Sequence, residues 1–198
     1  MYTHIRSNSA RRTRGLLALA TATAATVGPG ALHGTVPTEV TVVGMTVTGF
    51  DATVAAQNGY EIRTDSAGRQ YSAPQGSSTL APAPGDLSVA PYNVVTGNCG
   101  SSYVYLYDIG DKKYRVSTGF GVVAPAVGYT WSANVVGPRY NTTHRWTGGL
   151  FFRRTWQGAA VSLVNVAGVH TARASGWAVL SNGAICRSLG PIDNEAIF

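Results

Sequence analysis

Charged side chains are scarce in this sequence: they make up 12% of its 198 residues, whereas apolar residues make up 44%. Chains that remain disordered combine high charge with low hydrophobicity, so this composition excludes a long disordered protein and a low-complexity acidic or basic one. The chain also has 24 glycines and 9 prolines. Its length and turn-forming content indicate one compact domain with turn-rich extensions.

Acidic residues are the scarcest charged type, and their positions leave little for acid–base or metal chemistry. From residue 86 onward they fall in a linker, one turn and the C-terminal tail, as Asp86, Asp108, Asp111, Asp193 and Glu195. A glycosidase needs two carboxylates that flank a cleft. A zinc site needs three or four well-placed ligands. We therefore expect no glycosidase centre, no metal site and no cofactor.

Cysteine is limited to Cys99 and Cys186. An even number of cysteines in an exported chain favours a disulfide, so we predict that these two residues are bonded. Two buried free thiols are the alternative.

Long hydrophobic runs are absent as well. The first 33 residues hold several basic side chains and no acid, followed by an apolar stretch and a run of small residues. The stretch from residue 16 to residue 27 is too short and too rich in threonine to span a bilayer. This layout predicts a signal peptide over residues 1–33 and export without a stable membrane span. The Arg11-Arg12 pair leaves open export in a folded state.

The net charge of +6 is concentrated in that N-terminal segment. Residues 34–198 carry 11 basic and 9 acidic groups, so the charge supplies no argument for a nucleic-acid partner. Acidic residues prevail up to residue 110 and basic ones between residues 111 and 190. We expect the N-terminal segment to dock on the basic region around Arg153 and Arg154.

The remaining chain divides into four parts. Residues 34–72 predict an extension made of a strand, a helix capped by Asp51 and stopped at Gly59, and a hairpin. Residues 73–91 read as a Pro/Gly/Ser linker, residues 92–191 as a β domain and residues 192–198 as a tail.

The β domain shows about seven short segments of strand type separated by turn signals. Residues 127–135 alternate most clearly between apolar and small or polar side chains, and Asn182-Gly183 is typical of a two-residue hairpin turn. Further strands are expected at residues 102–107, 114–123, 150–156, 161–166, 169–175, 177–180 and 184–186. The pattern predicts an all-β fold, an antiparallel β-sandwich with a small β-barrel as the alternative.

Two regions resemble segments of small exported actinobacterial proteins of unknown function. They are residues 59–72, which contain Gly-Tyr-Glu-Ile-Arg-Thr-Asp, and residues 180–186, Leu-Ser-Asn-Gly-Ala-Ile-Cys. The resemblance implies export and a bacterial source, and it carries over no catalytic residue.

Aromatic side chains are the feature best able to support a function. All four tryptophans lie in the β domain, together with Tyr103, Tyr105, Tyr107, Tyr114, Tyr129 and Tyr140. Most are expected to pack in the core, but residues 140–146 read as an exposed loop. We expect the binding contacts to come from Tyr140, His144, Arg145 and Trp146.

Three functions follow from these observations. The first is an exported non-catalytic binding domain whose partner is a cell-surface polysaccharide or protein. The second is a secreted hydrolase that uses His144 or His170, although no Gly-x-Ser-x-Gly elbow occurs in the sequence and His170 fits a structural role better. The third is an inhibitor or a toxin-like effector.

Overall fold

The computed structural model describes residues 39–78 and 97–198; the predicted signal peptide and most of the predicted linker lie outside these ranges. In chain order the described residues form β1 (Val42–Phe50), α1 (Ala52–Gln57), β2 (Tyr60–Thr64), β3 (Gln70–Pro74), β4 (Gly100–Asp108), β5 (Lys113–Val122), β6 (Ala126–Gly137), β7 (Tyr140–Gly149), β8 (Thr155–Leu163), β9 (Gly168–Leu180), β10 (Ala184–Ser188) and β11 (Ile192–Ile197). The all-β prediction is confirmed.

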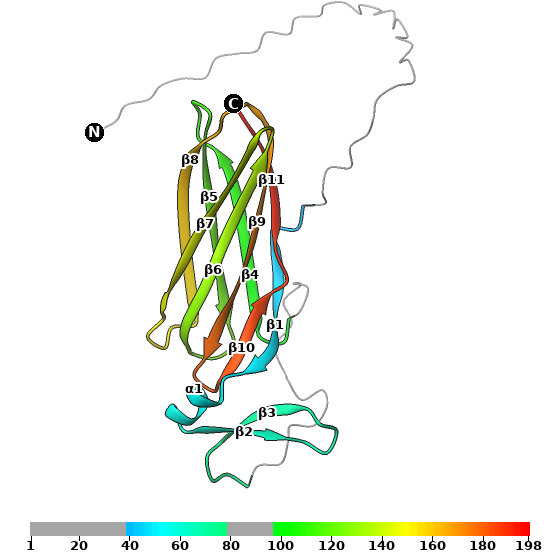
Figure 1. Ribbon diagram of the computed structural model, residues 1–198, viewed down its shortest axis with the longest axis vertical. Coiled ribbons are helices and arrows are strands. Elements are labelled where there is room, and N and C mark those ends of the chain that lie inside the picture. Colours follow the sequence, from blue (N-terminus) through cyan, green and yellow to red (C-terminus); the bar gives the residue numbers. More distant parts are fainter. Residues whose placement is uncertain (1–38, 79–96) are drawn as a thin grey trace, which may run out of the picture. The chain divides into compact units, whose positions relative to one another are not determined.

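Nine of the described strands assemble into one antiparallel sheet that curls into a nearly closed barrel (Figure 1), the alternative that we named beside the sandwich. Within the described residues the strand order is β7-β6-β9-β10-β1-β4-β5-β8, with β11 paired to β9 and β2 paired only to β3. β7 and β8 are therefore the two edges of the sheet. They are consecutive in the chain, yet no ladder of hydrogen bonds joins them in the described part of the structure.

The N-terminal segment belongs to this sheet instead of extending from it. β1 lies between β10 and β4, with Val47 opposite Cys186 and Val42 opposite Tyr103. The residues that we expected to be a C-terminal tail form β11, which pairs with the first half of β9. Both differences have one cause, because pairing between distant segments depends on the whole fold and not on local pattern.

Helix α1 and the β2–β3 hairpin contact the barrel at the β9–β10 turn, not through the arginines that we expected. The Asp51 N–H donates to the Gly183 carbonyl at 2.8 Å, and the Ser72 hydroxyl donates to the Asn182 carbonyl at 2.7 Å. Gly183 has a φ of +85°, and a Cβ there would lie 2.8 Å from Cβ of Ala55 in α1. The turn thus needs glycine for its conformation and for the close approach of the helix.

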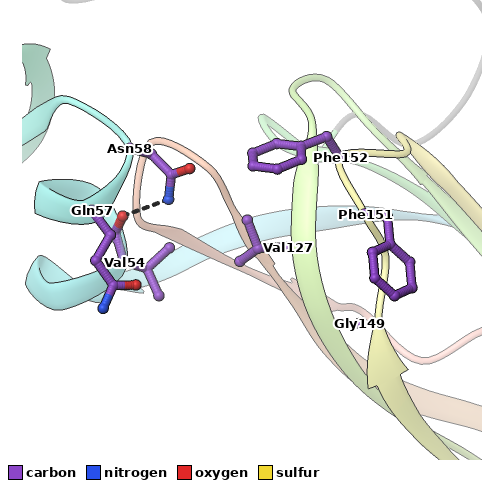
Figure 2. Close-up of a pocket in the computed structure, with 7 residues that line it drawn as sticks. All are labelled: Val54, Gln57, Asn58, Val127, Gly149, Phe151 and Phe152. Carbon is purple, nitrogen blue, oxygen red and sulfur yellow. Dashed lines mark hydrogen bonds between the residues drawn. The ribbon is translucent and has the colours of Figure 1, made fainter.

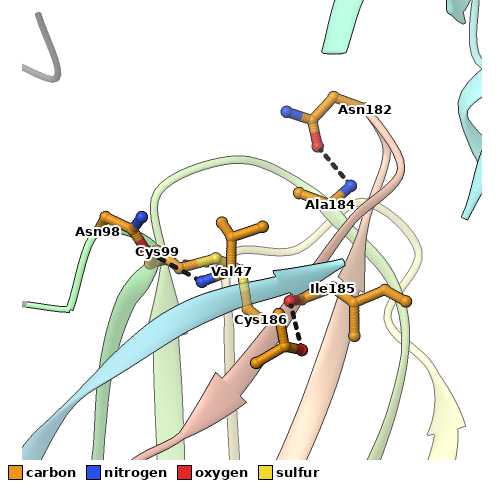
Figure 3. Close-up of a disulfide and its surroundings, with 8 residues drawn as sticks. Val47, Asn98, Cys99, Asn182, Ala184, Ile185 and Cys186 are labelled. Atoms are coloured by element: carbon orange, nitrogen blue, oxygen red, sulfur yellow. Dashed lines mark hydrogen bonds between the residues drawn. A yellow bond between two sulfur atoms is a disulfide. The ribbon is translucent and has the colours of Figure 1, made fainter. Parts of the chain in front are cut away.

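The predicted disulfide is present (Figure 3). Cys99 and Cys186 are bonded and fully buried, with Cα atoms 5.8 Å apart. The Cys99 N–H donates to the Met45 carbonyl, and Cys186 lies opposite Val47. The disulfide therefore joins the two segments that flank β1 in the sheet: the residue just before β4 on one side and β10 on the other.

Side chains fill the inside of the barrel. Trp131, Tyr114 and Phe120 are the largest of the fully buried side chains, and aliphatic residues from β4, β5, β6 and β9 surround them. The interior is thus a packed core, and ligands have to be sought on the outer face, at the seam between β7 and β8, and at the ends of the barrel.

Candidate functional site

The residues that we expected in an exposed loop form strand β7. Side chains of Tyr140, His144 and Trp146 are half-buried and alternate with exposed Arg145. The expectation of a loop was wrong. The inward face of this strand carries threonine, histidine and tyrosine instead of aliphatic residues, so the sequence does not show the alternation of apolar and polar side chains that is typical of a strand. The four residues also do not converge, since Arg145 points away from the other three.

Tyr140 and His144 meet Tyr114 at the inner side of the seam between β7 and β8. The Tyr114 hydroxyl lies 3.1 Å from the Tyr140 hydroxyl and 2.9 Å from Nε2 of His144. Burial, reinforced by Tyr140, raises the pKa of Tyr114 far above its ordinary value. Burial lowers the pKa of His144. For Tyr140 burial raises the pKa, but hydrogen bonds with Thr142, Tyr114 and Ser162 outweigh it and leave the pKa below its ordinary value.

This network holds neutral groups in place. A buried imidazole with a lowered pKa is uncharged at neutral pH, and a phenol with a raised pKa keeps its proton. Within the described residues no group of three or more His, Cys, Asp and Glu side chains is placed to bind a metal ion. We read the network as the packing that fills the wider part of the seam.

Trp146 completes an aromatic cluster at the other end of the seam. Its ring centroid lies 5.7 Å from that of Trp156, and Trp156 in turn stacks at 4.7 Å on Tyr129 and at 5.8 Å on Phe120. Such contacts stabilise a core. Trp146 is therefore largely a packing residue.

His170 is a structural residue, as its sequence context indicated. It is fully buried, and its Nδ1 hydrogen-bonds with the Gly168 carbonyl at 2.8 Å. A Cβ on Gly137 would lie 2.0 Å from the imidazole, so the neighbouring strand closes tightly over the ring.

The outer face of the barrel carries a row of three tyrosines that were not among the binding contacts that we expected. Tyr103, Tyr105 and Tyr107 alternate along β4 with buried residues, and adjacent ring centroids are 5.4 Å and 6.3 Å apart. Tyr107 is exposed and the other two are half-buried. We call these three side chains the tyrosine row.

Small residues on β5 support this row. Ser117 lies opposite Tyr105, and Gly119 lies opposite Tyr103. A Cβ on Gly119 would be 2.7 Å from the Tyr103 hydroxyl, so the Tyr103 ring lies across that glycine. Burial raises the pKa of Tyr103, as do Tyr105 and Tyr107. The combination of tyrosines on one strand with serine and glycine on the next is the sequence signal that could have found this surface.

Polar side chains border the tyrosine row. Exposed Arg115 is opposite Tyr107 in the β4–β5 ladder, and exposed Gln157 is opposite Gly119 in the β5–β8 ladder. Rings flanked by a guanidinium and an amide offer apolar faces together with hydrogen-bond donors, and such surfaces suit hydroxyl-rich ligands.

A second surface feature is the turn between β7 and β8, where we expected a strand over residues 150–156. Phe151 and Phe152 are 87% and 59% exposed and have φ angles of +47° and +65°. The turn is fixed by backbone bonds, among them Phe152 N–H to the Ala126 carbonyl. Phe152 points toward α1 across a shallow hollow of about 380 Å³, whereas Phe151 points away (Figure 2). Val54, Gln57, Asn58, Val127 and Gly149 complete the lining.

In the part of the chain that the structure describes, no helix combines the length and the apolar character needed to cross a bilayer. Comparison of the chain with protein-family models, curated proteins and solved structures finds no match, so its function has to be argued from these surfaces.

Proposed function

We propose that this protein is an exported, non-catalytic binding domain that holds an extended polysaccharide, such as a cell-wall polymer, along the tyrosine row. The observation that carries the proposal is the row itself, with three tyrosine rings on one outward face of β4 above the small residues of β5. Aromatic rings stack on the apolar faces of sugars, and their hydroxyls remain available for hydrogen bonds.

The surroundings of the row favour a polymer over a compact ligand. The three rings follow one strand, with adjacent centroids 5.4 Å and 6.3 Å apart, so the aromatic surface is elongated along β4. Small ligands prefer enclosed pockets that bury most of their surface. An extended chain instead gains affinity from several weak, repeated contacts.

Two further observations support an exported protein. The Cys99–Cys186 disulfide is of the kind that persists in oxidising compartments. The basic and apolar pattern of residues 1–33 is typical of a signal peptide. The resemblance of two segments to small exported actinobacterial proteins points the same way.

The test is retention on immobilised cell-wall polysaccharide and on soluble β-glucan, α-glucan and chitin fragments by affinity electrophoresis. Tyr105→Ala removes the central ring, and we expect about tenfold weaker binding. Tyr105→Phe keeps the ring and should bind nearly as well as the wild type. Phe151→Ser removes an exposed ring elsewhere and serves as the control.

The same assay separates the tyrosine row from strand β7. Loss of retention in Arg145→Ala with full retention in Tyr105→Ala would move the site to β7 and overturn the assignment. If the wild type is retained on none of these polymers, the function itself is wrong.

A further inference from the structure

β8 is an edge strand whose outer backbone groups have no partner within the described residues. The Arg154 carbonyl accepts from the Val122 N–H, and the Val164 N–H donates to the Lys112 carbonyl. The backbone N–H and C=O groups of the even-numbered residues in this segment therefore point toward β5. The odd-numbered residues direct both N–H and C=O away from it, and these are Thr155, Gln157, Ala159, Val161 and Leu163.

The side chains along this edge lack the features that protect edge strands. Lysine, proline or a bulge usually keeps an exposed edge from pairing with another chain. β8 contains no charged residue and no proline, and its ladder with β5 runs without a break in register. Val161 and Leu163 are 54% and 61% exposed, so the apolar surface lies in the C-terminal half of the strand.

In the described part of the structure no backbone ladder joins β7 to that half of β8, which β7 contacts only from the inner side, where the Tyr140 side chain hydrogen-bonds with Ser162. The two strands leave their connecting turn in different directions (Figure 1), with Trp146 and Trp156 in contact on the inner side near that turn. Farther along, the seam is filled from inside by Tyr114 and Tyr140. The outward backbone groups around Val161 therefore remain open to another chain.

We propose that a second copy of this protein pairs antiparallel with β8, on a twofold axis at Val161. In this register Val161 lies opposite its own counterpart, and Ala159 lies opposite Leu163 of the second copy. Residues 159, 161 and 163 all direct their N–H and C=O groups outward, so each facing pair can exchange both hydrogen bonds.

The edge matches a second copy better than a foreign peptide. A small residue faces a large one on both sides of the axis, so the strand is complementary to itself in volume. The strand contains no charged side chain with which to select a different sequence. The charged side chains of the β5–β8 ladder, Lys113 and Arg115, lie on β5, one strand away from the edge.

This pairing would have a direct effect on ligand binding. A twofold axis perpendicular to the sheet keeps the same face outward in both copies, so β4, β5 and β8 of each copy would form one continuous outer surface. Two tyrosine rows would then lie on one side of the dimer and could hold one polymer at two points. This consequence rests on the proposed function, whereas the pairing itself does not.

Sedimentation equilibrium of the full chain between about 1 and 100 μM tests the pairing without any ligand. We expect a dimer for the wild type and a monomer for Val161→Lys, because two ammonium groups would face each other across the axis. Val169→Lys is the matched control: Val169 is 55% exposed on β9, so the change is the same at a site outside the edge. It should remain dimeric.

A covalent readout completes the experiment. Val161→Cys should form an intermolecular disulfide under mild oxidation, since facing residues of an antiparallel pair lie within disulfide range. Val169→Cys should not. Circular dichroism and thermal melting establish that each variant is folded. A monomeric wild type at 100 μM, or a folded Val161→Lys that remains dimeric, would overturn the proposal, and neither result depends on polysaccharide binding.

Discussion

The indole Nε1 of Trp131 donates a 2.9 Å hydrogen bond to Oγ1 of Thr118 in the middle of the barrel. The Thr118 hydroxyl in turn donates a hydrogen bond of 2.7 Å to the Tyr103 carbonyl. Both side chains are buried, so these two consecutive hydrogen bonds, the relay of Trp131 and Thr118, satisfy polar groups that have no access to water. The relay also ties the largest core side chain to the strand that carries the tyrosine row.

Replacement of Thr118 by valine should destabilise the protein. The change keeps the volume but leaves the Trp131 N–H without an acceptor in the core, which costs about 1–3 kcal/mol of unfolding free energy. Thr118→Ser keeps the hydroxyl and should lose less. Urea unfolding followed by tryptophan fluorescence measures both, and equal stability of Thr118→Val and the wild type would refute the role of the relay.

The disulfide should contribute strongly to stability. Cys99 and Cys186 are 87 residues apart, and closure of a loop of this length stabilises a fold by about 4.6 kcal/mol on the chain-entropy model. The double variant Cys99→Ser/Cys186→Ser should lower the unfolding free energy accordingly. Mass spectrometry after alkylation checks the bond, since two alkyl groups should add to the denatured wild type only after reduction.

The stability should fall in mildly acidic solution because of His144. Burial holds its pKa in the folded state below the unfolded value of about 6.5, so the unfolded state binds the proton more tightly. The contribution of His144 to the free energy of unfolding is fully present above the unfolded pKa of about 6.5, and it is lost as the pH falls from there through the pKa of the folded state. Denaturant titrations at pH 8, 7, 6 and 5 measure the slope.

His144→Gln provides the comparison for this pH dependence. Glutamine does not titrate, so the difference between wild type and variant isolates the contribution of this imidazole. We expect the stability curve of the variant to be flatter between pH 7 and pH 5. Parallel curves would show that His144 does not couple protonation to folding.

The left-handed backbone at Phe151 should be a source of strain. A bulky residue with a φ of +47° is unfavourable, and at 87% exposure its ring makes little contact in return. Phe151→Asn should raise the unfolding free energy by about 1 kcal/mol, because asparagine tolerates this conformation. Phe198→Asn is the control, since Phe198 is 69% exposed without a positive φ. A gain of the same size in both variants would assign the effect to hydrophobicity instead.

Local features of the fold could be predicted from the sequence. Asp51 caps α1 through its side chain, and Gly59 follows the helix with a φ of +79°. The Asn182-Gly183 turn and the alternation of β6 are also as expected. These features depend on neighbours within a few residues, which local patterns record.

Features that depend on distant partners could not be predicted. The sequence around Phe151 and Phe152 favours a strand, but backbone bonds from the β5–β6 region hold it as a turn. β7 was hidden because its inward side chains are polar or aromatic and are satisfied by Tyr114 and the tryptophan cluster. The sequence therefore predicted a loop where the structure has β7, whereas the surface that we propose as the site lies on β4.

β1 is synthesised before both strands that flank it in the sheet, and one of them, β10, lies near the end of the chain. It pairs with β4 through residues 42–45, and with β10 through residues that extend to Ser188. The sheet is therefore interrupted between β1 and β10 until almost the entire chain has been synthesised. Contacts this far apart slow folding and leave strand edges exposed during synthesis. The pairing of β1 with β10, and the bond from Cys99 to Cys186 in β10, can therefore form only after the end of the chain has been made.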